Sequence, residues 1–475
     1  MDINQLKKLS KIGLAALFVL FIGAIVFYKE RVFFGDASFI IFKIINRKTF
    51  EIQEHRYGSF VTQMIPYFGQ IWHLPLKVLV VGYSISFNLF YLSVAAILHR
   101  CRQYAFTVLM ALYYFLFASA SYFWTNNEIH QAVAWMFLMF GLTAYLGTKK
   151  VNIFVTATVF SLLAFLTIFT HYVVIIPTFF LWVYLMIEKD RWPFSTAANI
   201  LFSVLLAVII TAKFLVTADH SYDGNCLRSV THVSFKDIYD AFTTPVIEMF
   251  VRRCVTNYWV GVVCLMLGIV GLVKTHRFRL LAWTLVSLVG YFIIMGLTYG
   301  VYDRDFSFFH IESEWASIGI IVGTPFVFTY LPKLRIQLAA GLLVVVFLVR
   351  LFYLGAAVPP FTWRTQFKEH VMSEMKKKGI TKLALINDDN LFKKNIMIWA
   401  IAEESMMMSG LEGDNPQLSF RLVNNDEKEL INDISATRGM STVFGIIEPR
   451  YLNQEYFHID TTRPYQIMTY EQLFK

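Results

Sequence analysis

The residues best suited to chemistry stand directly after the first apolar run of the chain. Asp36 follows Gly35 in the segment GDAS, and the segment EHRY at 54–57 comes after a second greasy stretch. An ionised carboxylate at the edge of a hydrocarbon layer is costly unless it is solvated, paired or used. Near a substrate hydroxyl, it can accept the proton that makes the hydroxyl nucleophilic. Asp36 is therefore a candidate general base, although an ordinary aspartate at the start of a loop fits the same pattern.

Cations near the same predicted membrane face could bind a phosphate leaving group, because that group carries negative charge. The candidates are His55 and Arg56 in the first loop, Lys213 near the end of a predicted span, and Arg304 in a later loop. Lys213 is embedded in the apolar segment VIITAKFLV. Intramembrane cations usually face a polar cavity, but a lysine this close to a helix end can also extend to the lipid headgroups.

Four further residues could bind a hydroxyl-rich substrate at that face. They are Glu54 and Tyr57 in the first loop, Glu128 after SYFWTNN, and His171 beside the fifth predicted span. Glu128 could bind hydroxyls or a divalent ion, or it could simply favour the start of the helix that it begins.

Metal and disulfide chemistry leave weaker signals. The eleven histidines form no HExxH or comparable pattern, so no tightly bound metal is expected, and no cofactor is required. A weakly held Mg²⁺ or Mn²⁺ near Asp36 is left open. Cys226 and Cys254 fall in one predicted external loop, 218–254, where they could form a disulfide in an oxidising compartment or remain two free thiols.

The elements that must position these residues are membrane spans. Of the 475 residues, 57% are hydrophobic and 16% are charged, and the mean hydropathy is +0.54, which is typical of a polytopic α-helical membrane protein. Eleven apolar runs are long enough to cross a bilayer. They are 12–28, 74–98, 104–124, 128–147, 151–169, 173–187, 196–217, 255–273, 279–300, 311–331 and 336–355.

Lys and Arg in the short connections predict the orientation, because cationic loops resist translocation. They alternate so that the N-terminus is cytoplasmic, and the loops 29–73 and 218–254 and all residues after 355 are external. The net charge of +9 reflects this topology and contact with anionic lipids rather than nucleic-acid binding. No Asn-x-Ser/Thr sequon occurs, which favours a bacterial inner membrane over a eukaryotic secretory one.

The external parts are expected to have structure of their own. In the loop 29–73, the segments 37–46 and 59–74 predict two helices that lie in the membrane interface and roof a cavity. A transmembrane module, 1–355, is followed by a soluble α/β domain, 356–475, with strands at 381–387, 418–423 and 441–448. Alternation of these strands with helices at 364–379, 390–408 and 426–434 favours a mainly parallel sheet between two helical layers.

This arrangement is similar to the GT-C superfamily of membrane glycosyltransferases. The superfamily includes the protein mannosyltransferases, the lipid A aminoarabinose transferases and the O-antigen glucosyltransferases. The likeness rests on GDAS at the start of a long first external loop, about eleven spans and a soluble C-terminal domain. It implies that Asp36 is the base for inverting attack at a sugar's anomeric carbon. The protein mannosyltransferases have an Asp-Glu pair here, whereas Ala37 follows Asp36, so Glu51, Glu54 or Glu128 would supply a second acid.

The function implied is transfer of a hexosyl or pentosyl group from a polyprenyl-phosphate donor, such as a sugar on undecaprenyl phosphate. The acceptor would be an exported glycan, lipid or protein, and the C-terminal domain would cover the cavity or hold that acceptor. Two alternatives stay open. One is an O-antigen-type polymerase or ligase, which the loop 218–254 supports because it contains Arg252 and Arg253. The other is a lipid or glycan flippase, against which the absence of internal symmetry counts.

Overall fold

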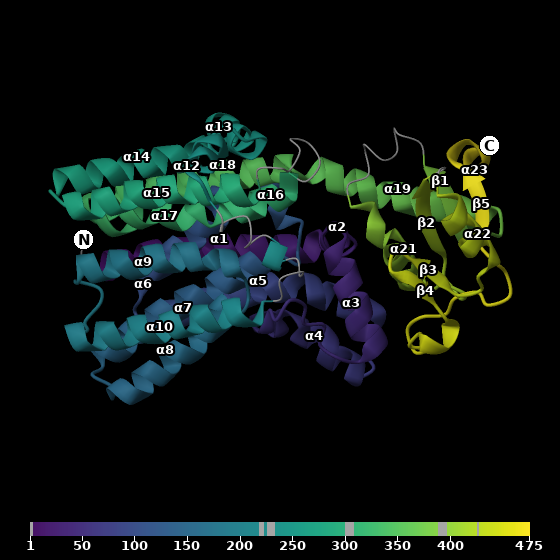
Figure 1. Cartoon of the computed structure of the whole chain (residues 1–475), viewed down its shortest axis with the longest axis horizontal. Helices are drawn as coiled ribbons and strands as arrows, with labels where there is room; N and C mark the ends of the chain where they lie inside the picture. Colours follow the sequence, from purple (N-terminus) through teal and green to yellow (C-terminus); the bar gives the residue numbers. More distant parts are fainter. Residues whose placement is uncertain (1–2, 218–222, 226–232, 300–307, 388–396, 425–426) are drawn as a thin grey trace.

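The computed structural model describes residues 3–217, 223–225, 233–299, 308–387, 397–424 and 427–475. Its long apolar helices form one bundle, and a small sheet with its own helices lies at the far end of the molecule (Figure 1). The N-terminus is at the opposite end of the bundle. The bundle therefore lies between the N-terminus and the sheet.

The bundle contains long helices and several shorter ones. They are α1 (Ile3–Val26), α5 (Leu76–Arg100), α6 (Tyr104–Leu116), α7 (Glu128–Thr148), α8 (Ile153–Ile168), α9 (Ile175–Glu188), α10 (Thr196–Val216), α14 (Trp259–Lys274), α15 (Phe278–Tyr299), α16 (Phe308–Ala316), α17 (Ile318–Pro325) and α18 (Ile336–Ala356). Two short helices, α12 (Phe235–Ala241) and α13 (Pro245–Thr256), precede α14.

The helix lengths identify a membrane protein. Among the described residues, seven helical segments are long and apolar enough to cross a bilayer. An eighth is added if the bent pair of 235–256 and 259–274 counts as one span. The apolar helices α6, α8 and α9 also coincide with predicted spans but are shorter. The membrane class is thus confirmed, while the count of eleven spans stays a prediction.

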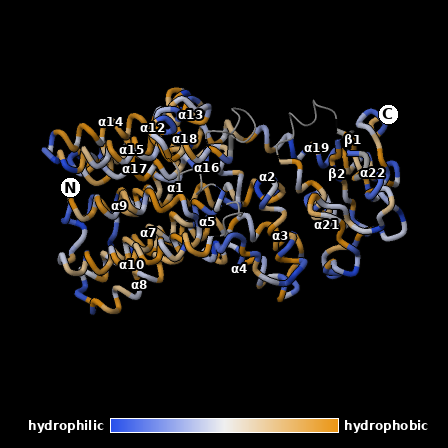
Figure 2. Tube along the Cα trace, in the orientation of Figure 1, coloured by the Kyte–Doolittle hydropathy of each residue, from blue (hydrophilic) through white to orange (hydrophobic). Residues whose placement is uncertain are grey.

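The outer surface of the bundle is apolar, as a hydrocarbon environment requires. Large side chains such as Phe154, Leu215 and Phe352 are more than two-thirds exposed, at 77%, 81% and 71%. A contiguous apolar surface of this kind would be a liability in water. Figure 2 shows hydrophobic residues along the whole length of the bundle helices, with hydrophilic residues gathered at their ends and beyond.

Helix α3 (Asp36–Arg47) differs from the predicted interfacial helix. Its position agrees with the predicted segment, but Ile40, Ile41, Ile44 and Ile45 are at most 2% exposed, because the helix packs between the bundle and the C-terminal region. A helix that is apolar on all sides is usually buried in protein. By contrast, α4 (Phe60–Ile71) keeps exposed apolar residues, as a helix at a membrane surface would.

The C-terminal region holds a parallel sheet with strand order β2-β1-β5. Its elements are α19 (Val358–Lys377), β1 (Lys382–Asn387), α21 (Ile401–Leu411), β2 (Ser419–Asn424), α22 (Lys428–Ala436), β3 (Met440–Thr442), β4 (Gly445–Ile447), β5 (Gln466–Thr469) and α23 (Tyr470–Phe474). In β1, Leu383 and Leu385 pack in a different core from Ala384, so both faces of the sheet are covered. The predicted strands at 381–387 and 418–423 and the helices at 364–379 and 426–434 are confirmed within a few residues. The expected helix at 390–408 lies partly outside the described residues.

The predicted strand at 441–448 is wrong in form. The chain reverses within it, so that β3 and β4 pair antiparallel as a short hairpin, with Thr442 opposite Gly445. Gly445 has φ of +120°, a backbone conformation that glycine adopts at little cost. The sequence pattern of alternating apolar residues did not show this turn.

The C-terminal region shares its main core with the membrane part. The core that includes Leu383 also contains residues of α3 and of the adjoining end of α5, such as Leu79 and Tyr83. The predicted boundary after residue 355 also falls inside a helical run, because Ala357 ends α18 and precedes α19. Pro359 and Pro360 occupy the first turn of α19, where no backbone N–H is needed.

Candidate active site

A cavity of about 840 Å³ opens where α3, the first loop, α7 and α16 meet. This volume is in the range of small-molecule sites. Its lining consists of Asp36, Lys43, Glu51, Gln53, Glu54, Arg56, Trp124, Asn126, Asn127, Glu128, Ile129, His171, His310, Ser313, Glu314, Met397 and Phe444. Segments that are far apart in the sequence therefore build one polar cavity at one end of an apolar bundle.

Asp36 is placed at this cavity by a backbone conformation that requires glycine. Gly35 has φ of +52° and ψ of −120°, and a Cβ on it would lie 2.8 Å from Cε of Met397. Side-chain-bearing residues rarely adopt such a conformation. This residue turns the chain from α2 (Tyr28–Val32) into α3, so that Asp36 becomes the first residue of α3.

Glu404 of α21 holds the turn in place from the C-terminal region. Its Oε1 accepts hydrogen bonds from the backbone N–H of Gly35 at 2.8 Å and from Oγ of Ser38 at 3.3 Å. The carboxylate is fully buried, and it also pairs with Arg364 and Lys368, each at 2.7 Å. Burial raises the pKa of Glu404, but the two cations outweigh this effect and lower it, so Glu404 is ionised.

The same two cations bind the other side of the turn. Arg364 donates to the carbonyl of Phe33 at 2.6 Å, and Lys368 donates to it at 2.7 Å. Residues 33 to 38 are thus hydrogen-bonded on both sides of Asp36 to one buried, charged cluster of Arg364, Lys368 and Glu404. We call these three residues the turn clamp.

Asp36 itself has the acid–base properties that a base requires. Burial raises its pKa to about 6, the nearby carboxylate of Glu128 adds to this, and Arg56 and the indole of Trp124 act in the opposite direction. A base whose pKa lies near the working pH is both ionised and able to hold a proton. Asp36 thus combines partial exposure to the cavity with a proton affinity suited to catalysis.

Arg56 connects Glu128 to a second acid, Asp223. Its guanidinium lies 3.2 Å from Oε2 of Glu128 and 2.6 Å from Oδ1 of Asp223. Asp223 is fully buried, and although burial raises its pKa, Arg56, His171 and Lys213 together lower it. Because the sequence gives no local signal around Asp223, sequence reasoning missed this residue.

Lys213 lies behind Arg56 and is not on the cavity lining. Its Nζ donates to the carbonyl of Glu54 at 2.9 Å and lies 3.5 Å from Oδ2 of Asp223. Glu54 and His55 both have positive φ, +49° and +56°, which is strained for residues with side chains. Lys213 therefore stabilises the tight turn that leads into Arg56.

The predicted substrate-binding residues on the lining are Glu54, Glu128 and His171. Asn127, not Glu128, caps α7, since its side chain accepts from the N–H of Ile129 at 3.0 Å. Glu128 instead pairs with Arg56 and accepts a bond from Asn126 at 3.1 Å. Burial, together with Arg56, lowers the pKa of His171 well below its usual value, and its Nδ1 accepts from the backbone of Val173. His171 is therefore neutral, with its proton on Nε2.

Helix α16 adds an acid that was not predicted. Glu314 lines the cavity and is 3% exposed, and its Oε2 has no hydrogen-bond partner among the described residues. It falls inside the predicted span 311–331, and an acid in a span is by default a functional candidate. That signal was present in the sequence.

Several predicted residues are not brought to the cavity lining. The side chains of His55 and Tyr57 are exposed and lie next to each other, with Nδ1 of His55 3.0 Å from the hydroxyl of Tyr57. Arg304 and Cys226 lie outside the described residues, so the phosphate contact and the disulfide stay predictions. Cys254 is half-buried on α13.

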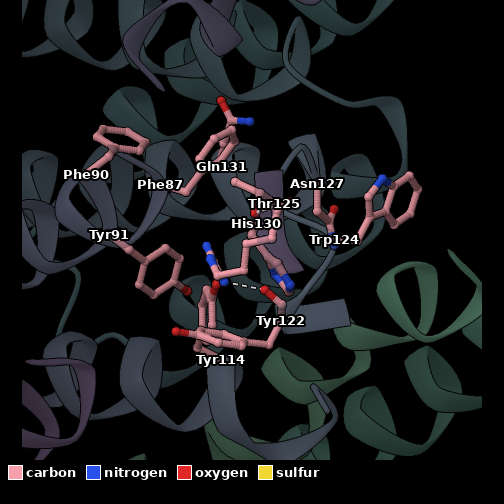
Figure 3. A pocket seen from close by; sticks show the side chains of 11 residues that line it. Phe87, Phe90, Tyr91, Tyr114, Tyr122, Trp124, Thr125, Asn127, His130 and Gln131 are labelled. Atoms are coloured by element: carbon pink, nitrogen blue, oxygen red, sulfur yellow. Dashed lines mark hydrogen bonds between the residues drawn. The ribbon is translucent and has the colours of Figure 1, made fainter. Parts of the chain in front are cut away.

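A second, nearly closed pocket lies behind the cavity and is lined by aromatic and amide side chains (Figure 3). With about 10 Å³ of free volume, it can hold roughly one water molecule. Arg31 lies in it, 1% exposed, and donates to Ser84, to Asn88 and to the carbonyl of Tyr122. The hydrogen bonds of Arg31 therefore connect α2 to α5 and to the loop after α6.

Among the described residues, no group of three or more His, Cys, Asp or Glu side chains is arranged to hold a metal ion. No family model, curated protein or solved structure matches this chain. The residues of the cavity are therefore the basis for assigning a function.

Proposed function

We propose that the protein is an inverting glycosyltransferase of GT-C type, which uses a sugar carried on a polyprenyl phosphate. The observation that carries the proposal is Asp36, a base with a pKa of about 6, on the lining of a polar cavity at one end of an apolar bundle. A lipid-borne donor and a water-borne acceptor can meet only at such a boundary. The proposal includes eleven spans in a bacterial inner membrane, a cytoplasmic N-terminus and an external C-terminal region.

In the proposed reaction, the carboxylate of Asp36 accepts the proton of an acceptor hydroxyl within about 3 Å. The hydroxyl oxygen attacks the anomeric carbon of the donor sugar and forms the new C–O bond. The bond between that carbon and the phosphate oxygen breaks, and the polyprenyl phosphate leaves with the electron pair. The configuration at the anomeric carbon is inverted, and no covalent enzyme intermediate forms.

Arg56 and His171 are the groups on the described lining that suit the departing phosphate. Arg56 is a permanent cation, and Nε2 of His171 is a hydrogen-bond donor. The carboxylates of Glu51, Glu54, Glu128 and Glu314 outnumber the cations Lys43 and Arg56 on the described lining. These acids are suited to accept hydrogen bonds from sugar hydroxyls, so a phosphate fits best beside Arg56.

The role proposed for Lys213 is to position other groups, because it is buried behind Asp223 and bound to the turn at Glu54. His55 and Tyr57 lie on the exposed side of that turn, where Tyr57 stacks on Phe165 and Phe169 of the bundle. A polyprenyl chain that enters from the membrane would pass this aromatic surface. We therefore place these two residues at the donor's entrance rather than at the phosphate.

The polymerase or ligase alternative depends on Arg252 and Arg253. Both belong to α13, and neither lies on the lining of the cavity that contains Asp36. The flippase alternative would need charged groups along a path through the bundle, whereas the cavity gathers its charges at one end. The proposed transferase reaction uses these charges to accept a proton and to bind the substrates.

The test compares envelope glycans by mass spectrometry in three strains of the source organism. They are the wild type, a gene deletion, and the deletion complemented with Asp36→Asn. We expect a defined sugar mass to disappear on deletion and not to return with Asp36→Asn, whereas the exposed control Asp240→Asn restores it. Full restoration by Asp36→Asn, at equal protein level, would remove Asp36 from the mechanism.

A further inference from the structure

A second large cavity, of about 930 Å³, lies between α3 and the β3–β4 hairpin. It is lined by Phe39, Phe42, Lys43, Asn46, Arg47, Gln53, Glu403, Thr442, Phe444, Gly445, Ile446, Ile447 and Tyr451. Lys43, Gln53 and Phe444 line the cavity of Asp36 as well. The two cavities therefore lie next to each other and share these three side chains, and we call the second one the hairpin groove.

The hairpin groove contains a buried acid with one carboxylate oxygen that the described residues leave unsatisfied. Glu403 of α21 is 1% exposed, and its Oε2 has no hydrogen-bond partner among the described residues. Leaving a buried carboxylate oxygen unpaired is costly, because the oxygen loses its bonds to water without replacing them. Its neighbour Glu404 is fully paired in the turn clamp, so one turn of α21 presents a satisfied acid to the Asp36 turn and an unsatisfied one to the groove. An unsatisfied acceptor in a cavity is a place for a ligand that donates a hydrogen bond.

Aromatic rings form part of the lining of the groove, together with amide and charged side chains. Phe444, at the tip of the hairpin, is 69% exposed, and its ring lies 4.9 Å from that of Phe39 and 5.7 Å from that of Trp399. The ammonium group of Lys43 lies 4.0 Å from the centre of the Phe39 ring. Exposed aromatic faces beside amide and charged groups are suited to the apolar C–H faces and the hydroxyl edges of sugar rings.

We infer that the hairpin groove binds the acceptor, and that the acceptor is a glycan whose terminal hydroxyl reaches Asp36. This inference rests on the proposed transferase function and names its acceptor class. A glycan lying on Phe444 would donate a hydrogen bond from one hydroxyl to Oε2 of Glu403. It would then extend past Gln53 into the cavity of Asp36. An acyl chain would fit poorly, because Lys43, Arg47 and Glu403 line the groove.

The experiment measures glycan binding directly, in protein that cannot turn over. The full chain carrying Asp36→Asn, purified in detergent, is titrated with polysaccharide released from the envelope of the deletion strain, which lacks the added sugar. Phe444→Ala and Glu403→Leu are added separately to this background. We expect each to raise the Kd at least fivefold, and the matched control Phe352→Ala, an equally exposed phenylalanine on α18, to leave it unchanged.

Glu403→Leu separates binding from folding. Because it removes a buried unpaired acid, its melting temperature should equal or exceed that of the parent while glycan binding weakens. Equal Kd values for the parent, Phe444→Ala and Glu403→Leu would overturn the groove as the acceptor site. A parent that does not bind the polysaccharide would overturn the glycan class. Neither result tests the proposed transferase function. The envelope comparison with Asp36→Asn tests that function, and it does not depend on the groove.

Discussion

Asp36 illustrates how burial, a neighbouring carboxylate and a neighbouring cation together can tune the pKa of a base. The charge of Glu128 and burial both favour the protonated form of Asp36, whereas Arg56 favours the ionised form. Removing the charge of Glu128 also takes away one of the two ion pairs of Arg56, while the pair with Asp223 remains, so both changes act on Asp36 in the same direction. The activity of the protein should therefore respond to pH through a group that these neighbours control.

We expect the rate of sugar transfer to rise with pH through about 6 and to level off above it, because only ionised Asp36 can accept the proton. Glu128→Gln should move this rise to lower pH, since it removes the like charge. Initial rates with a purified donor between pH 4.5 and 8.5 measure both curves. Glu51→Gln removes an acid of the same lining that is not among the groups shifting the pKa of Asp36, and it serves as the control. If the rise stays at the same pH in the Glu128→Gln variant, a group other than Asp36 causes it.

Gly35 supports Asp36 through backbone conformation alone. Gly35→Ala places a Cβ on a residue with φ of +52°, which strains any residue with a side chain, so we expect the turn to shift and move Asp36. A displacement of roughly 1 Å at a reacting group can reduce the rate about 10²-fold. We expect a loss of that order in kcat, measured with saturating donor. Gly355→Ala, which meets no atom within 4 Å, should leave the rate unchanged. A normal kcat in the Gly35→Ala variant would show that the turn does not position the base.

At the scale of elements, α21 and α19 act on α3 through the turn clamp. Glu404→Gln keeps the shape of the side chain but removes the carboxylate charge that pairs with Arg364 and Lys368 in a buried site. Breaking a buried ion pair in this way typically costs about 3–5 kcal/mol. We expect a clear fall in thermal stability together with a fall in transfer rate.

The matched control for Glu404→Gln is Glu412→Gln, at the end of the same helix. Glu412 pairs with Lys376, but both side chains are more than one-third exposed, so the change should cost less than about 1 kcal/mol. Thermal unfolding in detergent, followed by tryptophan fluorescence, compares the two. Equal losses for both variants would contradict a special role for the clamp.

Much of the element level could be predicted from the sequence. The spans, α3, β1 and β2 follow from runs and periods of apolar residues, which are local signals. Asp36 stood out because a charged residue at the edge of a membrane span is costly, and Arg56 because a departing phosphate is best stabilised by a cation. Glu314 carried the same signal inside a span and was overlooked.

What could not be predicted depends on contacts between distant parts of the chain. Gly35 and Glu404 are 369 residues apart, and Asp223 lies 167 residues from Arg56. No periodicity connects such pairs. The burial of α3 was missed for the same reason, because an apolar helix looks alike whether lipid or another part of the protein covers it.

At the scale of the whole molecule, the C-terminal region is part of the membrane protein's core rather than an appendage. Asn453 donates to the carbonyl of Ile45 at 2.8 Å, and Phe42 packs on Phe457 with ring centres 4.9 Å apart. A chain that ends at Ala357 would lose these contacts and the turn clamp. Helix α3 would then be exposed on the side that packs against the C-terminal region in the full chain.

We expect this truncated chain to insert into the membrane but to be inactive and readily cut by trypsin at Lys43 and Arg47. In the full chain, the packing of α3 should slow these cuts, since cleavage requires local unfolding. Lys149, in an exposed connection far from the C-terminal region, is the internal control and should be cut equally in both chains. A truncated chain that protects α3 and transfers sugar would show that the two parts are independent.

The reach of the turn clamp from Gly35 to Glu404 also bears on how the protein is made. Gly35 is synthesised 369 residues before its partner Glu404, which becomes available only after most of the membrane helices are made. A chain that stops before Glu404 would therefore lack the contact that fixes the Asp36 turn. Under the proposed function, we expect such a chain not to consume lipid-linked sugar.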